Sequence, residues 1–340
     1  LEATPLLQKA TELDRKFPEA QYGFAACLTV LKRYDDAIAA LTPGTKWGPK
    51  WRPKFLVGLG IVEMARDSLR AANVYFTTAR EEAPNDPEAH KALGDFYMKS
   101  RGIAELAIPE YEAAVALDST DVGLRYSLAQ GLGKGERYGQ ALEQYRKVVS
   151  MDPDFALGQL GLGQLLYRAG AADAKRYAEA REPLEIYTKL EPNDVRGWST
   201  LGKTYFYLKM RDEAAAAFAK AEQLGGVDKD TYTVMGRLYS DRKEWSKALA
   251  AFEKGTPTGR DMLIIGQMYV LNGQPARADS IYQSLIAKDS TSADARFAMG
   301  QIGTMRFRLQ DYPGAISAFQ RRIALDPGND EAYYYIGLSY

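Results

Sequence analysis

The sequence predicts an all-α protein, a right-handed α-solenoid of antiparallel helix hairpins, and three observations predict it. Apolar residues recur at i, i+3, i+4 and i+7 within short segments, which is the period of an α-helix. Asp-Pro steps and glycine-containing turns separate these segments, and such steps end helices. The same order of small and large residues returns about every 34 residues along the chain, as it does in stacked helical repeats.

Each expected hairpin carries small residues at fixed places on both of its helices. The first helix has an apolar residue followed by glycine or alanine, as in Leu93-Gly94, Leu128-Ala129, Leu162-Gly163, Leu201-Gly202, Met235-Gly236 and Ile265-Gly266. The second helix has a lone alanine and, four residues later, a large apolar side chain, as in Ala107 and Tyr111, Ala141 and Tyr145, Ala180 and Leu184, Ala214 and Phe218, Ala248 and Phe252, Ala278 and Tyr282, and Ala315 and Phe319. Small side chains remove bulk where two helices cross. Because one hairpin cannot bury its apolar faces alone, stacked neighbours must complete the core.

This spacing resembles the tetratricopeptide repeat, whose pattern places W/L, L, G/A, Y, A, Y/F, A and P within 34 residues. The segment 195–228 matches best, with Trp198, Leu201, Gly202, Tyr205, Ala214, Phe218 and Ala221. The resemblance covers essentially the whole chain. It implies a single array over 1–340 with a half-repeat at 1–17, repeats starting near 18, 53, 87, 122, 156, 195, 229, 259 and 293, and a half-repeat at 330–340.

Several segments depart from the pattern. The repeat 156–194 has about five extra residues around 170–175, and 229–258 is shortened at Gly255-Thr256-Pro257. In 293–329, either Met299-Gly300 or Ile302-Gly303 can occupy the small-pair position. At 42–53, three prolines replace the end of a second helix around Trp47 and Trp51. These tryptophans either cover apolar surface that the short helix leaves, or form an exposed loop contact for a partner.

Composition limits the function classes. Lys+Arg 44 against Asp+Glu 44 gives a net charge of zero, which argues against non-specific nucleic-acid binding and against a polybasic membrane-surface protein. Apolar stretches are too short for a membrane span, and residues 1–20 suggest a folded helix rather than a signal peptide. We therefore expect a soluble protein without membrane insertion, and the sequence predicts no compartment.

Catalytic and metal-binding patterns are missing from the sequence. The single cysteine, Cys27, and the single histidine, His90, fall in different repeats, so neither a Cys–His pair nor a zinc site is expected. No Walker loop or HExxH motif occurs. We expect no catalytic residues, no cofactor and no metal, and therefore not an enzyme.

The resemblance implies a ligand-facing surface at positions two, five, nine, twelve and thirteen of the first helices. The candidate groove residues are Tyr126, Gln130, Lys134, Gln164, Tyr167, Arg168, Arg196, Lys203, Phe206, Tyr207, Arg237, Arg260 and Gln267. Aromatic faces, amides and a mild basic excess suit an extended peptide with some acidic character, although they also suit an ordinary solvated helix face. The carboxylate clamp of chaperone-binding repeats is not expected, since no repeat has a basic residue at position five with asparagine at nine.

The two half-repeats leave apolar residues without an expected partner. They are Leu7 and Ala10 in the first, and Tyr333, Ile336 and Tyr340 in the second. Either the chain is a segment of a longer one, or copies assemble head to tail through these faces. The leading expectation for function is a non-enzymatic scaffold that binds a protein or peptide partner, as an extended peptide or a helix, in its groove. The alternatives are a self-assembling structural module and the regulatory arm of a longer enzyme.

Overall fold

The computed structural model describes residues 2–99 and 104–340. Within these ranges the secondary structure is helical, without a strand, and consecutive helices pack as antiparallel pairs. The predicted all-α class and α-solenoid of hairpins are thereby confirmed. The helices fall into two compact units, one ending at Leu190 and the other spanning Glu191–Tyr340. That the whole chain forms a single array stays a prediction.

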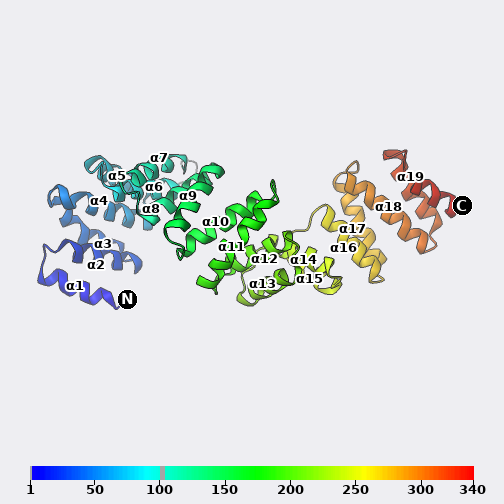
Figure 1. The fold of residues 1–340 in the computed structure, drawn as a ribbon, viewed down its shortest axis with the longest axis horizontal. Coiled ribbons are helices and arrows are strands. Elements are labelled where there is room, and N and C mark those ends of the chain that lie inside the picture. The colour runs from blue at the N-terminus through cyan, green and yellow to red at the C-terminus, as the bar shows by residue number, and fades with distance from the viewer. Residues whose placement is uncertain (1, 100–103) are drawn as a thin grey trace. The chain divides into compact units, whose positions relative to one another are not determined.

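The first unit contains five first helices and the second helices that pack on them (Figure 1). The first helices are α2 (Pro18–Val30), α4 (Gly48–Ala65), α6 (Pro87–Lys99), α8 (Val122–Lys134) and α10 (Ala156–Ala169). The second helices are α1 (Ala3–Leu13), α3 (Tyr34–Leu41), α5 (Leu69–Glu82), α7 (Ala107–Leu117), α9 (Tyr138–Met151) and α11 (Lys175–Leu190). Two short 3₁₀ segments, η1 (Thr42–Lys46) and η2 (Ala104–Leu106), precede α4 and α7.

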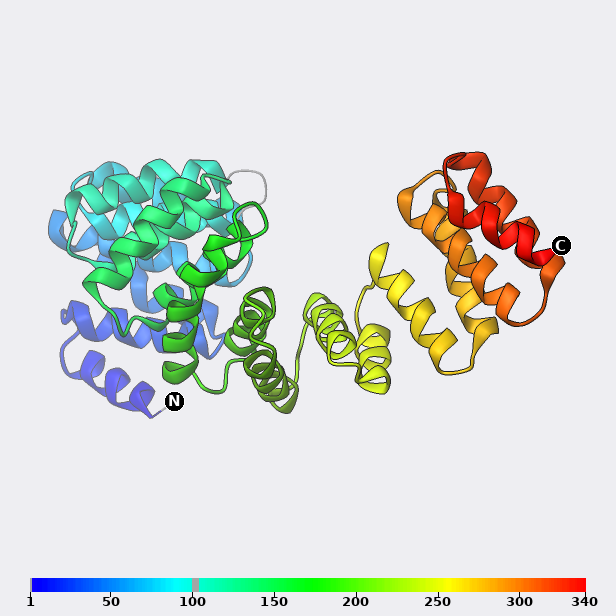
Figure 2. The same ribbon diagram turned by 45° about the vertical axis from the view of Figure 1, so that its right-hand side comes forward.

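The second unit repeats this plan. Its first helices are α12 (Val195–Tyr207), α14 (Lys229–Asp241), α16 (Arg260–Leu271), α18 (Ala293–Arg308) and α20 (Asp330–Ser339). Its second helices are α13 (Arg211–Leu224), α15 (Trp245–Lys254), α17 (Pro275–Lys288) and α19 (Tyr312–Leu325). Figure 2 shows α18 to α20, in orange to red, as consecutive antiparallel helices.

Side-chain caps explain why several first helices begin where they do. The carboxylates of Asp121, Asp194 and Asp228 accept hydrogen bonds from backbone N–H groups in the first turns of α8, α12 and α14. Ser292 and Asn329 do the same for α18 and α20. The first N–H groups of a helix have no partner within it, so a capping oxygen favours that start.

The small residues lie where helices cross, as the sequence predicts. The seven lone alanines, Ala107, Ala141, Ala180, Ala214, Ala248, Ala278 and Ala315, are all 0 % exposed. Glycines of the first helices face the large residue four places after the alanine. A Cβ on Gly202 would lie 2.6 Å from the Phe218 ring, and one on Gly94 would lie 2.7 Å from the Tyr111 ring. Each glycine therefore makes the space that the opposing ring fills.

The same contact settles the ambiguous repeat. Gly303 lies against Phe319, at 2.7 Å for an added Cβ, whereas Gly300 lies under the Arg322 side chain. Ile302-Gly303 is therefore the small pair of α18. The additional residues before this pair extend the start of α18, which has 16 residues.

The proline-rich segment is more helical than its composition predicts. The second helix α3 has 8 residues, and after η1 the helix α4 begins at Gly48, ahead of the repeat start expected near 53. Pro49 occupies the first turn, where a missing N–H costs no hydrogen bond. Trp47 is the residue that precedes α4, and Trp51 lies in its first turns.

A left-handed residue closes most of the turns within hairpins. Lys32, Asp67, Glu136, Lys209, Lys243 and Gln310 have φ between 59° and 67°. Each directly precedes the N-cap residue of a second helix. Next to Lys32, the N–H of Arg33 donates back to the carbonyl of Leu28 at 2.8 Å, which ends the first helix and reverses the chain.

Candidate functional site

The first helices α2 and α4 enclose an apolar hollow on the face of the first unit. Its volume is about 220 Å³, and its lining comes from Tyr22, Ala25, Ala26, Thr29, Val30, Leu41, Gly58, Ile61 and Val62. Gly58 makes room for it, since an added Cβ would lie 2.9 Å from the Tyr22 ring. Two of the lining side chains remain in solvent, with Val30 83 % and Ile61 39 % exposed. Covering them with another apolar surface would be favourable.

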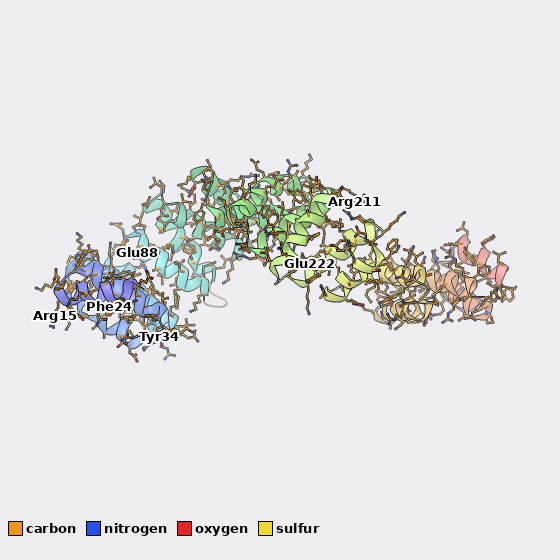
Figure 3. The ribbon with its side chains drawn as sticks, turned by 90° about the horizontal axis from the view of Figure 1, so that it is seen from below. Arg15, Phe24, Tyr34, Glu88, Arg211 and Glu222 are labelled. Atoms are coloured by element: carbon orange, nitrogen blue, oxygen red, sulfur yellow. The ribbon has the colours of Figure 1, made fainter. Side chains whose placement is uncertain are left out.

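A second hollow of about 290 Å³ shares Tyr22 with the first. Its lining is Glu19, Tyr22 and Gly23 from α2, Trp51, Lys54 and Phe55 from α4, and Glu88 from α6, labelled in Figure 3. Burial and the nearby charge of Glu88 raise the pKa of Tyr22 to about 12, so its phenol stays neutral and can donate a hydrogen bond. We call the two hollows together the N-terminal groove. It offers apolar contact along its length and charges of both signs at one end.

The two tryptophans lie beside this groove rather than in a free loop. Trp47 packs edge-on against Phe55, with ring centroids 5.1 Å apart, and both indoles contact the core formed by α2, α3 and α4. The Nζ atoms of Lys50 and Lys54 lie 5.3 Å and 5.7 Å from the Trp51 ring. Each indole is half-buried. They cover apolar surface, and Trp51 also presents an edge to the second hollow, so a partner contact through Trp51 stays a prediction.

The candidate groove residues of α8 contact their own neighbours. Gln130 donates to the Tyr126 hydroxyl at 2.7 Å, and the Tyr126 ring packs against Tyr145 and Phe155. Lys134 donates to the backbone carbonyl of Met98. On α10, Tyr167 packs against Tyr177, Gln164 is half-buried, and Arg168 is exposed beside Tyr138. The structure places each of these residues on a first helix, and that they contact a partner stays a prediction.

In the second unit, two of the expected basic residues pair with an acidic residue of the next first helix. Lys203 is 9 % exposed and lies 2.9 Å from an Asp230 carboxylate oxygen. Arg237 makes a bidentate pair with Asp261, at 2.6 Å and 2.8 Å, and Asp261 is 3 % exposed. The Asp261 hydrogen bond raises the pKa of Arg237. These cations therefore tie neighbouring first helices together, and the pairs reduce the basic excess that the sequence indicates there.

The remaining candidates of this unit are more exposed. Arg196 pairs with Asp194 at 2.6 Å, and Phe206 packs edge-on against Tyr207, with centroids 5.3 Å apart. Arg260 and Gln267 on α16 are exposed. That these side chains contact a partner stays a prediction.

The residues expected at the end faces differ in exposure. Leu7 of α1 is half-buried over Gly23 of α2, and Ala10 is half-buried too. Tyr333 of α20 and Tyr340, which follows this helix, are 53 % and 88 % exposed, whereas Ile336 packs against the core of α19 and α20. Gly337 would meet no atom within 4 Å of an added Cβ, unlike the glycines that face a ring.

Among the described residues, few groups of polar side chains could do more than hold neighbouring helices together. His90 places Nδ1 2.6 Å from Glu110 and Nε2 2.9 Å from the Pro84 carbonyl, which fixes the start of α6 against α7. Across residues 2–99 and 104–340, no three His, Cys, Asp or Glu side chains gather as metal ligands would. No helix of those same ranges is both long and apolar enough to span a bilayer.

Sequence reasoning missed the N-terminal groove, although a sign of it was present. Val30 and Ile61 occupy positions thirteen and nine of their repeats, which are ligand-facing positions. Apolar residues at such positions indicate a contact surface, as aromatic, amide and basic side chains do.

Family comparison agrees with the helix pattern. One family model described as tetratricopeptide repeat matches residues 1–55. A second model with the same description matches residues 57–122, 126–174 and 265–330. The second model alone covers more than half of the chain. The chain belongs to the tetratricopeptide repeat family. Tetratricopeptide repeats generally bind protein partners and are usually non-catalytic, so the chain is a repeat protein of the kind that serves as an interaction scaffold.

Curated relatives of this tetratricopeptide repeat protein are distant and varied. The anaphase-promoting complex subunit CDC16 of Saccharomyces cerevisiae is 25% identical over 57% of this chain and 23% of its own length. The cytochrome c-type biogenesis protein CycH of Pseudomonas aeruginosa is 26% identical over 68% and 52%, respectively. The human protein O-mannosyl-transferase TMTC3 is 25% identical over 63% and 24%. The chain thus spans about half or less of the length of these relatives.

Solved structures share the fold at low sequence identity. A structure titled as a functional characterisation of Pseudomonas aeruginosa pilF has a TM-score of 0.51 at 20% identity, over 58% of this chain and 88% of that one. A tetratricopeptide repeat protein from Parabacteroides merdae has a TM-score of 0.50 at 15% identity, over 69% and 92%. These similarities support the helical-hairpin fold.

Proposed function

We propose that this tetratricopeptide repeat protein is a non-enzymatic scaffold that holds an extended peptide or a partner helix along its first helices. The observation that supports this most directly is the N-terminal groove. Apolar side chains line its first hollow, and two of them, Val30 and Ile61, are 83 % and 39 % exposed on a face where the fold presents consecutive first helices. A peptide or helix with an apolar stripe would cover them.

Phage-displayed peptides selected on the full chain give the test. The double variant Val30→Glu and Ile61→Glu places two carboxylates in the apolar hollow, and binding would have to desolvate them. We expect the Kd of the selected peptides, measured by fluorescence anisotropy, to rise at least about tenfold. Far-UV circular dichroism should stay unchanged, because glutamate is a good helix former and both sites face solvent.

Val74→Glu is the matched control, because Val74 is also a solvent-exposed valine, 58 % exposed, but lies on the second helix α5. It should leave peptide binding unchanged. An equal loss in both proteins, or selected peptides that bind the double variant as tightly as the original, would contradict the proposal.

A second candidate function is self-assembly into head-to-tail filaments or a larger complex, through α1 and α20. It is favoured by the exposed side chains of Tyr333 and Tyr340. Mass photometry from nanomolar to micromolar concentration tests it. Concentration-dependent oligomers that Tyr333→Ser with Tyr340→Ser removes would support assembly, and a monomer throughout would reject it.

A third candidate function is that of an arm within a longer enzyme, since a protein O-mannosyl-transferase is among the relatives. We propose that the repeats themselves carry no catalytic step and that, within a longer enzyme, they would act as an arm that binds partners. The double variant Val30→Glu and Ile61→Glu tests this role. In the longer enzyme it should weaken binding of the partner and leave unchanged the turnover of a substrate that does not contact the repeats.

A further inference from the structure

A pocket in the first unit lies where the inserted residues between α10 and α11 meet α9, all of which Figure 1 labels. Its volume is about 390 Å³. Leu142, Leu165 and Ala169 supply its apolar surface, and Tyr138, Arg168 and Arg176 supply its polar groups. It is separate from the N-terminal groove, since the two share no lining residue.

The insertion contributes directly to this pocket. Between α8 and α9 the chain reverses over residues 135–137, but between α10 and α11 it takes residues 170–174. Ala172 of this longer turn is part of the pocket wall. The insertion therefore adds surface beside α9 that a turn of ordinary length would not reach.

Arg168 is the charged group of the pocket that lacks an acidic partner. Its guanidinium lies 5.4 Å from the centroid of the Tyr138 ring, and Nη2 lies 3.4 Å from the Tyr138 hydroxyl. Within residues 2–99 and 104–340, no carboxylate forms an ion pair with Arg168. The cation–π contact with the Tyr138 ring and the hydrogen bond to its hydroxyl position the guanidinium, while its remaining N–H groups stay available.

The other charges around the pocket largely cancel. Arg176 lies 3.0 Å from a Glu179 oxygen and 3.7 Å from Asp173, and Glu179 also pairs with Arg146 at 2.6 Å. Of the two arginines that line the pocket, Arg176 is therefore paired with carboxylates and Arg168 is not.

We propose that this pocket binds a peptide segment in which a carboxylate stands next to a bulky apolar side chain. The carboxylate, from an aspartate or glutamate side chain, accepts hydrogen bonds from Arg168. The apolar side chain lies against Leu142, Leu165 and Ala169. A guanidinium that is held in place before binding loses less conformational entropy when the peptide binds. Its contact with the carboxylate can therefore contribute to affinity and favour acidic peptides.

Fluorescence anisotropy with the full chain and defined peptides tests this proposal. The probes are fluorescein-labelled heptapeptides in a Gly-Ser background, amidated at the C-terminus, that carry Glu-Leu, Glu-Phe or Asp-Leu. Matched peptides carry Gln-Leu or Glu-Gly, and one further peptide ends in leucine with a free carboxylate. Acidic–apolar peptides should bind, and the Gln-Leu and Glu-Gly peptides should bind at least about tenfold more weakly. Binding of the free-ended peptide without binding of the amidated Glu-Leu, Glu-Phe and Asp-Leu peptides would overturn the assignment to a side-chain carboxylate.

Two pairs of variants locate the site. Arg168→Gln should weaken binding about tenfold or more, whereas Arg181→Gln, an exposed arginine of α11 outside the pocket, should not change it. Gly139 lines the pocket, and a Cβ there meets no atom within 4 Å. Gly139→Leu should therefore obstruct the pocket, while Gly139→Ala keeps it open.

The outcome separates this site from the N-terminal groove. The variant with Val30→Glu and Ile61→Glu should bind the acidic–apolar peptides as the original does, and all variants should keep the original melting temperature within a few degrees. Equal binding of Glu-Leu and Gln-Leu peptides would overturn the proposal. So would a loss with Arg181→Gln that matches the loss with Arg168→Gln.

Discussion

Tyrosines at the same position of different repeats have different hydrogen-bonding partners. Tyr111 and Tyr282 both stand four residues after a buried alanine and both face a glycine of the first helix. The Tyr111 hydroxyl donates to Asp95 at 2.7 Å. The Tyr282 hydroxyl is buried and makes no hydrogen bond among the described residues. A buried polar group without a partner costs free energy.

Phenylalanine at these two positions should therefore act in opposite directions. Tyr111→Phe removes a hydrogen bond to a carboxylate and should lower the free energy of unfolding by about 1.5 kcal/mol. Tyr282→Phe removes an unsatisfied hydroxyl and should raise it by about 1 kcal/mol. Thermal melting followed by circular dichroism checks the sign of each change. A lower melting temperature for Tyr282→Phe would show that the hydroxyl has a partner in solution.

At the scale of an element, the crossing glycine of a first helix decides how closely the second helix packs. Gly202→Ala would place a Cβ 2.6 Å from the Phe218 ring, and we expect it to destabilise the protein by about 1–3 kcal/mol. Gly337 has no atom within 4 Å of an added Cβ, so Gly337→Ala should raise helix stability by about 0.5–1 kcal/mol. Urea unfolding of both variants measures the difference. Equal effects of the two substitutions would mean that helix propensity, and not the opposing ring, sets the result.

Most helices could be predicted from the sequence because their apolar residues follow the helical period, and several first helices also have a strong local start. Asp121, Asp194 and Asp228 are capping residues that stand immediately before an apolar-periodic segment. The start of α4 at Gly48 was not predicted, because prolines were taken to end helical structure. Pro49 lies in the first turn, where proline is tolerated, and the core contacts of Trp47 and Trp51 stabilise the added turn.

The candidate site was harder to predict than the helices, for a physical reason. The repeat pattern identifies residues on the first helices but not their partners in the next repeat. Lys203 and Arg237 form ion pairs with Asp230 and Asp261, which lie 27 and 24 residues away. Such contacts depend on how neighbouring repeats stack. The open apolar positions Val30 and Ile61 were accessible to sequence reasoning, but only a structure shows that they line one hollow.

At the scale of the molecule, buried tyrosines make stability sensitive to alkaline pH. Burial raises the pKa of Tyr22 and Tyr282 to about 12, and it raises the pKa of Tyr111 and Tyr145 as well. An unfolded tyrosine has a pKa near 10. Between about pH 10 and pH 12 the folded state therefore binds more protons than the unfolded state. The stabilisation is complete below pH 10 and is lost as the pH rises through about 12.

Melting temperatures between pH 9 and pH 12 test this dependence. The original protein should lose stability across the window, and the double variant Tyr22→Phe with Tyr282→Phe should lose less, because it has two fewer groups to ionise. Lysines also titrate there, but they do so in both proteins, so the difference between the two curves isolates the tyrosines. Parallel curves would show that these two phenols do not contribute.

The contact between a crossing glycine and the opposing ring has a consequence for how such a chain can change over generations. Gly202 with Phe218 and Gly236 with Phe252 form nearly the same fit, at 2.6 Å for an added Cβ in each case. A hairpin carries both halves of this fit within itself, and it contacts chiefly the hairpins beside it. A duplication or loss of one whole hairpin would therefore keep the internal fit of every remaining hairpin. Within each unit, length can vary in steps of a hairpin, while a lengthened turn such as residues 170–174 adds new surface without disturbing the fit.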